Sequence, residues 1–215
     1  MAKQIEGVFE QVLACAKKEF LARGYRDASL RTIAQEAHTS TGSIYTRFGD
    51  KEGLFNAIVA PAADGLKELF VRMQEDFHRL GAQAQRSDMC RYSADGMEVV
   101  LDFIYAHFDD FHLLLDAAEG TLYQHFADEL VEIEVYYTFQ FFEAVQCEAI
   151  VSGRITREFI HIISTCYVNG VFEVVRHNMS RADAERYITM LGRYHRAGFA
   201  TILGEDATFF GFPVQ

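Results

Sequence analysis

The chain has 215 residues, half of them hydrophobic, and a net charge of −11 at neutral pH. This is enough apolar sequence to bury a core without disulfides or bound metal, and no run approaches the roughly 18 apolar residues of a membrane span. The start "MAKQIEGVFE" has no signal-peptide pattern, so we expect a cytoplasmic protein. An acidic chain is at first sight a poor partner for nucleic acid, because proteins that bind phosphates are usually basic.

The charge is unevenly distributed along the chain. Residues 1–60 contain eight Lys and Arg against seven Asp and Glu, whereas residues 61–215 contain 12 against 24. This asymmetry suggests two domains, with the acidic one kept away from any polyanion that the first one touches.

The first 60 residues predict a series of helices. Apolar residues recur at i, i+3, i+4 and i+7 over residues 5–20, which predicts a first helix, and Gly24 is expected to end it. Ser29 is a good N-cap for a short second helix, in which the apolar side chains from Leu30 to Ala37 repeat with the same period.

A third helix is predicted after a three-residue turn, His38 to Ser40, with Ser40 or Thr41 as its cap. Ile44 and Phe48 point inward at i, i+4 spacing. Two short helices joined by such a turn and braced by a longer one form a helix-turn-helix, whose second helix must enter a major groove about 12 Å wide. Small polar side chains and Gly42 suit that close approach; the alternative is a short polar surface helix. The outward set is Thr41, Ser43, Thr46 and Arg47.

A fourth helix is predicted from Asp50, its cap, to about residue 78, and Pro61 interrupts its apolar pattern. An interior proline removes a backbone hydrogen bond and clashes with the carbonyl four residues earlier. We therefore expect a kink or break near residues 57–61, the alternative being a new helix that starts at Pro61.

The remaining chain continues the helical pattern. Residues 79–88 form a polar connector, and apolar periodicity then predicts helices within residues 97–108, 111–118, 122–146, 159–174 and 180–198. Ser180 and Asp183 have the spacing of a helix cap. There are no strand signals, so the predicted fold is all-α with about nine helices.

The stretch "GYRDASLRTIAQEAHTSTGSIYTRFGDKEGLF" resembles the N-terminal signature of the TetR family of transcriptional regulators, over about residues 5–60. The shared features include Gly24-Tyr25, the pattern from Ser40 to Phe48, and Lys51-Glu52-x-Leu54. One departure is "AHTS", where the family usually has Ala-Gly-Val-Ser. His38 must then adopt a turn conformation that glycine adopts freely, at a cost of about 1 kcal/mol, and Thr39 becomes a candidate for a base contact.

The resemblance implies a domain organisation and a function. Residues 1–50 would be the DNA-binding domain, linked through the fourth helix (about 50–78) to a helical ligand-binding and dimerisation domain, residues 51–215. The protein would bind a palindromic operator as a homodimer, act as a repressor, and be released by a small-molecule effector. The resemblance further implies that the last two helices form a four-helix bundle with a partner chain.

The resemblance also assigns candidate residues. Tyr45, Arg47 and Lys51 would hold phosphates, and Ser29 could donate to one, while the threonines and Ser43 would face the bases; the Tyr45 ring alternatively plugs the three-helix core. The full DNA-binding set is Ser29, Thr39, Ser40, Thr41, Ser43, Tyr45, Thr46, Arg47 and Lys51.

Residues 61–215 contain 15 of the 19 Phe and 8 of the 10 Tyr. Such rings are usually core, and the resemblance alone implies a pocket for an apolar or aromatic effector. Its expected lining is Tyr105, Phe108, Tyr137 and Phe141. For Tyr167, Val171 and Val174 we prefer a dimer role to one in the chain's own core, partly because Gly170 permits close approach. The expected dimer interface is Phe159, Ile163, Tyr167, Val171, Val174, Tyr187 and Leu191.

Other functions have little support in the sequence. The four cysteines form no CxxC pair, and the histidines near Asp109 and Asp110 have no HxxxH spacing, so we expect reduced thiols and no metal site. Nucleophile-elbow, P-loop and dinucleotide fingerprints are missing, so we expect no enzyme and no cofactor. The alternative is a helical small-molecule-binding protein or enzyme with no DNA role.

Overall fold

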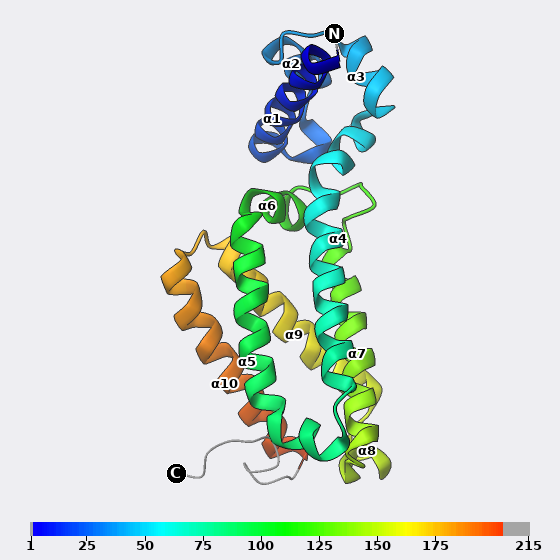
Figure 1. Ribbon diagram of the computed structural model, residues 1–215, viewed down its shortest axis with the longest axis vertical. Coiled ribbons are helices and arrows are strands. Elements are labelled where there is room, and N and C mark those ends of the chain that lie inside the picture. Colours follow the sequence, from blue (N-terminus) through cyan, green and yellow to red (C-terminus); the bar gives the residue numbers. More distant parts are fainter. Residues whose placement is uncertain (1, 204–215) are drawn as a thin grey trace. The chain divides into compact units, whose positions relative to one another are not determined.

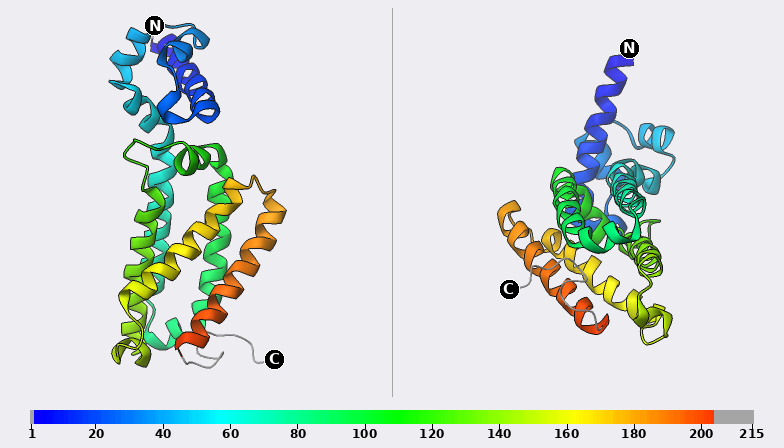
Figure 2. Two further views of the ribbon diagram at one scale, coloured as in Figure 1. Left: turned by 180° about the vertical axis from the view of Figure 1, so that it is seen from behind. Right: turned by 60° about the horizontal axis from the view of Figure 1, so that its bottom comes forward.

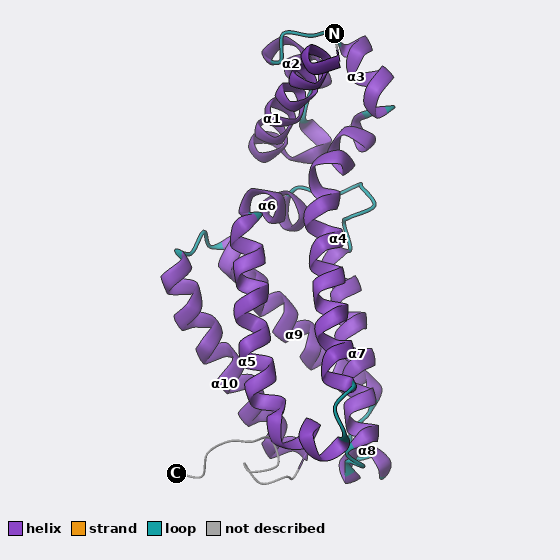
Figure 3. Cartoon of the chain, in the orientation of Figure 1, coloured by secondary structure: helices purple, strands orange, loops and turns teal. Residues whose placement is uncertain are grey.

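The computed structural model describes residues 2–203, with side chains over 7–202, and this part of the chain consists of ten helices and their connections, without strands (Figures 1 and 3). The predicted all-α fold is confirmed. The helix beyond the expected nine is α8, whose four residues are too few to show a period. The bounds are α1 Ala2–Asp27, α2 Leu30–Glu36, α3 Thr41–Phe48, α4 Lys51–His78, α5 Ala82–Ala106, α6 Phe108–Asp116, α7 Phe126–Ala144, α8 Glu148–Val151, α9 Arg157–Arg176 and α10 Arg181–Leu203.

The chain divides into two compact units. Unit 1 comprises the residues up to Gly65 together with His107–Phe126, and unit 2 comprises Leu66–Ala106 and the residues from Ala127 onward. The division therefore falls inside α4, and α6 belongs to the unit that contains α1, α2 and α3. The sequence pattern gave no sign that α6 would leave the second half of the chain.

Three contacts attach α6 and the residues after it to α1 within unit 1. The Tyr25 amide donates to the Ala117 carbonyl at 3.0 Å, and Lys17 Nζ lies 2.7 Å from Asp110 Oδ1. Gly24 makes the first contact possible, because its φ of 72° and ψ of 169° interrupt the helix and redirect the chain. The third contact is an ion pair between Arg26 and Glu119 at 2.9 Å.

Helix α4 continues through Pro61 without a non-helical residue, so neither the expected break nor a new helix start occurs there. Pro61 lies on the exposed side of the helix, as does Ala57, whose carbonyl loses its partner. Water can therefore solvate this carbonyl, and the missing hydrogen bond need not break the helix.

Unit 2 is a bundle of α5, α7, α9, α10 and the second half of α4. Helix α10 packs beside α5 and α9 (Figures 1 and 2). The predicted connector over residues 79–88 was wrong, because α5 begins at Ala82. Gln85 is buried there, and its amide donates to the carbonyls of Leu80 at 2.8 Å and His78 at 3.3 Å, which satisfies acceptors at the end of α4.

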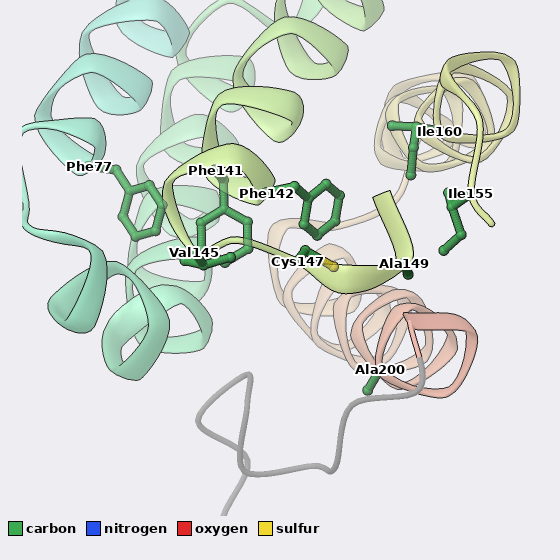
Figure 4. Close-up of a cluster of buried hydrophobic side chains, with 9 residues drawn as sticks. All are labelled: Phe77, Phe141, Phe142, Val145, Cys147, Ala149, Ile155, Ile160 and Ala200. Carbon is green, nitrogen blue, oxygen red and sulfur yellow. The ribbon is translucent and has the colours of Figure 1, made fainter. Parts of the chain in front are cut away.

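A buried apolar cluster joins the helices of unit 2 (Figure 4). Phe141 and Phe142 of α7 lie at its centre, with Phe77 of α4 on one side and Ile160 of α9 on the other. Such a cluster gives the bundle a rigid frame. None of the helices over residues 2–203 has the length and apolar character of a membrane-spanning helix.

Candidate functional site

The first candidate site is the outer surface of α2 and α3 in unit 1. As predicted, Ser29 is the N-cap of α2: its Oγ accepts from the Thr32 amide at 3.3 Å. Its own amide donates to the buried carboxylate of Glu19 at 3.1 Å, which ties the start of α2 to α1. The Ser29 hydroxyl proton is not used in capping, so it can still serve a phosphate oxygen.

The turn between α2 and α3 has the predicted geometry. His38 has a φ of 50°, the left-handed conformation that glycine adopts freely. The Thr39 amide donates to the Ala34 carbonyl at 2.9 Å, which closes the turn. Ser40 then caps α3, accepting from the Ser43 amide at 3.1 Å, and the two serine hydroxyls lie 3.0 Å apart.

The inner side of α3 fixes its position. Ile44 is fully buried, and the half-buried Phe48 meets the ring of Phe9 edge-on at 6.2 Å between centroids. Both inward assignments are confirmed. Asp50 caps α4 as predicted, because its Oδ1 accepts from the Gly53 amide at 2.8 Å.

The outer side of α3 presents small polar groups and one aromatic ring. Tyr45 is 53% exposed, so its ring does not plug the core. Thr46 Oγ1 donates to the Gly42 carbonyl at 2.9 Å, which turns its methyl group and a lone pair outward. The Arg47 guanidinium lies 4.6 Å above the Phe9 ring, and Ser43 is exposed beside it. Of the other residues proposed for base contact, Thr39 and Thr41 are half-buried.

Gly42 has no role in packing within the described chain. It is exposed, and a Cβ atom at this position would meet only Ser40 Oγ at 3.6 Å, an ordinary contact. Glycine inside a helix costs about 1 kcal/mol relative to alanine. A close approach by something outside the chain would explain why glycine occupies the position.

Lys51 has structural contacts that sequence reasoning missed. Its Nζ donates to the carbonyls of Arg26 at 2.9 Å and Ala28 at 3.1 Å, and it lies 4.8 Å above the Tyr25 ring. These partners are more than 20 residues away in sequence, so no local signal could reveal them. One ammonium hydrogen remains for a phosphate.

Lys51→Ala and Arg47→Ala should therefore differ in stability. We expect Lys51→Ala to lower the free energy of unfolding by about 1–2 kcal/mol, since two carbonyls lose their donor, and Arg47→Ala to change it by less than about 0.5 kcal/mol. Both should weaken binding to any DNA duplex. Chemical denaturation and a gel shift measure the two effects, and equal stability of both variants would contradict the structural role of Lys51.

The second candidate site is a cavity of about 220 Å³ inside unit 2, between α4, α5, α7, α9 and α10. Its wall is largely aromatic and methionine side chains. Tyr137 and Phe141 line it, as expected from the sequence. Tyr105 and Phe108 do not: the Tyr105 hydroxyl donates to the Met179 carbonyl at 2.7 Å, and Phe108 begins α6 in unit 1.

Polar and ionisable side chains also line the cavity, among them Glu134, Tyr167, His195 and Arg196. Both carboxyl oxygens of Glu134 accept hydrogen bonds, and burial raises the pKa of this group. Tyr167 stacks on His195 with ring centroids 4.2 Å apart. Burial raises the pKa of Tyr167 to about 12 and lowers the pKa of His195 to about 4, so both are neutral near pH 7. Arg196 has a buried Nε without a hydrogen-bond partner.

Several residues of the expected dimer interface have contacts within the chain itself. Val171 and Val174 lie in the chain's own core, Val174 being fully buried, and Tyr167 lines the cavity. The Tyr187 hydroxyl donates to the Gly170 carbonyl at 2.9 Å, which joins α9 to α10 within one chain. Of the other residues in the expected set, Ile163 and Leu191 are partly buried, and Phe159 is 36% exposed.

A neighbouring face of α9 and α10 is apolar and exposed instead. Its most exposed side chains are Ile162, Met190 and Tyr194, at 59%, 63% and 80%. Cys166, an exposed thiol, follows Ile162 by one turn, and Met190 and Tyr194 have the same i, i+4 spacing. Because both faces of α9 are apolar, the sequence alone could not show which one points outward.

Comparison with known proteins shows which family the helix-turn-helix segment resembles. Residues 12–58, which contain the capped helices and the positive-φ turn, match the model of the bacterial regulatory proteins of the tetR family. This match covers the helix-turn-helix segment of the chain. The recognition made from the N-terminal sequence motif is thereby confirmed.

Two TetR-family relatives match part of the chain. The HTH-type transcriptional repressor AcnR of Corynebacterium glutamicum is 30% identical over 91 residues, 38% of this chain and 48% of that protein. The HTH-type transcriptional regulator BetI of Stenotrophomonas maltophilia is 36% identical over 67 residues, 31% of this chain and 34% of that protein. The matched part thus spans less than half of each relative.

The likeness in fold extends further. A TetR-like transcriptional regulator from Rhodococcus sp. RHA1 has a TM-score of 0.58 and 20% identity, covering 90% of this chain and 96% of that chain. This similarity concerns the fold of most of the chain.

Proposed function

We propose that the chain is a TetR-family transcriptional regulator that binds operator DNA through α3. The observation that carries the proposal is the exposed polar face of α3, held by Ser40, Ile44 and Asp50 within a segment that matches the family. A helix of this size fits the major groove, where hydroxyl and methyl groups meet base edges. Gly42 would allow the helix to lie close to the DNA.

The proposal assigns roles by position on the helix. Tyr45 and Arg47 hold phosphates from the exposed face, and Lys51 does so with the hydrogen that its internal bonds leave free. Ser43, Thr46 and, from the turn, Thr39 face the bases. The helices of unit 2 take no part in this contact, and residues 1–60, which contain α2 and α3, are free of the acidic excess that residues 61–215 carry.

We further propose that the protein acts in the cytoplasm as a homodimeric repressor. The exposed apolar face of α9 and α10 supports dimerisation, because an isologous pair of identical subunits can cover it. Two reading helices related by a two-fold axis match the symmetry of a palindromic operator. A small molecule in the unit 2 cavity would release the DNA by favouring a conformation that spaces these helices wrongly.

Binding to DNA fragments retained from a genomic library tests the proposal, and three variants separate the roles. Tyr45→Phe, which removes only the hydroxyl, should weaken binding to all retained duplexes alike. Arg47→Ala should do the same and reduce the slope of log affinity against log salt by about 1 for each chain bound. Thr46→Ala should change the order of preference among duplexes.

Wild-type affinities in all three variants would contradict the proposed surface. A chain that retains no duplex at low salt would favour the alternative function, in which unit 2 binds a small molecule without a DNA role.

A further inference from the structure

Glu134 is an acid without a basic partner in the wall of an apolar cavity. Its Oε2 accepts from Gln74 Nε2 at 2.9 Å, and its Oε1 accepts from Thr138 Oγ1 at 3.5 Å, so both donors are neutral. No Lys, Arg or His of the described chain forms an ion pair with it. Glu134 is half-buried and helps to line the cavity, and burial raises the pKa of its carboxyl.

This arrangement costs stability and has no structural purpose among the described residues. A carboxylate removed from water without a counter-charge is unfavourable, whereas a glutamine could accept from Gln74 and donate to the Thr138 hydroxyl without that cost. Arg196 also lines the cavity, but on α10 it lies beside His195 and Gly192 and forms no ion pair with Glu134. The acid is therefore best explained by a charge that arrives from outside the chain.

The rest of the wall indicates what kind of charge this is. Tyr137 follows Glu134 by one turn of α7, and Tyr167 lies close enough for Glu134 to influence it. Aromatic faces attract cations, most strongly where water is excluded. Phe and Met side chains form much of the apolar part of the wall, and the methionines, Met73 and Met89 among them, adapt to an irregular apolar shape.

On the premise that this cavity is the effector site of the proposed regulator, we propose that it takes a hydrophobic cation, an aromatic or alkyl ammonium compound, with Glu134 as the counter-charge. The tyrosine rings contact the charged head, and the Phe and Met side chains contact the apolar part. Binding then satisfies a carboxyl that the unliganded chain leaves without a positive partner.

Three small probes test the sign of the charge. Benzyltrimethylammonium has an uncharged isostere, neopentylbenzene, in which carbon replaces the nitrogen, and 3-phenylpropanoate carries the opposite charge. Equilibrium dialysis against the full chain without DNA gives each affinity. We expect the cation to bind at least about tenfold more tightly than its isostere. Glu134→Gln should remove this preference, while Glu132→Gln, an exposed acid on the same helix, should keep it.

A second readout separates a ligand-binding role from a structural one. Because the pKa of Glu134 is raised by folding, its ionisation opposes folding, and this cost grows as pH rises above the ordinary value near 4.5. Glu134→Gln should therefore unfold at a higher temperature than the wild type at pH 7.5, with a smaller difference at pH 5. The cavity wall also carries other titratable or charged groups, which are the same in both proteins and therefore do not by themselves create a difference in unfolding temperature. These are His78, Tyr92, Tyr137, Tyr167, His195 and Arg196.

Equal binding of the cation and neopentylbenzene to the wild type would overturn the proposal. Tighter binding of 3-phenylpropanoate would overturn it in favour of an anion site at Arg196. Failure of all three probes to bind up to their solubility limits would also count against it, as would a Glu134→Gln variant that unfolds at a lower temperature at pH 7.5. Because none of these measurements uses DNA, a chain that binds the cation but no operator would refute the proposed function and leave this inference standing.

Discussion

Replacing Gly53 by alanine is expected to destabilise unit 1 by about 1–3 kcal/mol and to abolish sequence-specific DNA binding. A Cβ atom at Gly53 would lie 1.9 Å from the Phe48 carbonyl oxygen and 3.1 Å from its carbon. Both are backbone atoms at the end of α3, so no side-chain rotation can relieve the overlap. The first turn of α4 must shift, and it would displace α3 from the position that Ile44 and Phe48 hold.

Gly42→Ala is the matched control, since it adds the same methyl group to the neighbouring helix. The space there is open, so the variant should be more stable than the wild type by about 0.5–1 kcal/mol. Its DNA affinity should nevertheless fall, because the methyl group would lie against the DNA in the proposed complex. Thermal unfolding and operator binding measure both variants. A Gly53→Ala protein with wild-type stability, or a Gly42→Ala protein with wild-type affinity, would refute the respective argument.

The double replacement Ile162→Glu and Met190→Glu is expected to make the protein monomeric and to lower operator affinity by about 100-fold or more. In the proposed dimer these side chains lie in an apolar interface, where four added carboxylates would be both desolvated and mutually repelling. A monomer binds only one half-site. It therefore loses the high effective concentration that a dimer gives the second α3 helix once the first one is bound. Sedimentation equilibrium measures the association state.

Val151→Glu is the matched control for the dimer test. Val151 is 78% exposed but lies on α8, away from the exposed face of α9 and α10, so this variant should remain dimeric and bind operator normally. If the double variant still sediments as a dimer, the partner chain binds elsewhere. If Val151→Glu is also monomeric, the interface includes α8.

The success of the sequence reading depended on the range of the interactions involved. Ser29 and Asp50 were identified as caps, and Ser40 as one of two candidates, because each bonds an amide three residues away. The turn conformation of His38 was expected from the family pattern, which usually has glycine at that position. Pro61 was misjudged, although its effect is also local. The outcome there depended on solvent exposure of Ala57, which periodicity does not report.

The orientation of α9 could not be predicted from the spacing of its apolar residues. Apolar residues occur on more than one face of this helix, so the spacing of Val171 and Val174 fits a core stripe as well as a dimer stripe. Packing against α10, through the Tyr187 hydroxyl and the Gly170 carbonyl, decided that Ile162 and Cys166 point outward.

The sequence by itself therefore determined the helical fold, the helix-turn-helix and its family, because caps, turn residues and i, i+4 pairs act within a few residues of one another. The tertiary structure alone decided that Lys51 binds two carbonyls at the end of α1 and just after it, that α6 joins unit 1, and that Glu134 faces a cavity. Each of these depends on segments distant in sequence that meet only when the helices pack. The energy of such contacts comes from burial and from hydrogen bonds across the fold, and no pattern along a single helix records it.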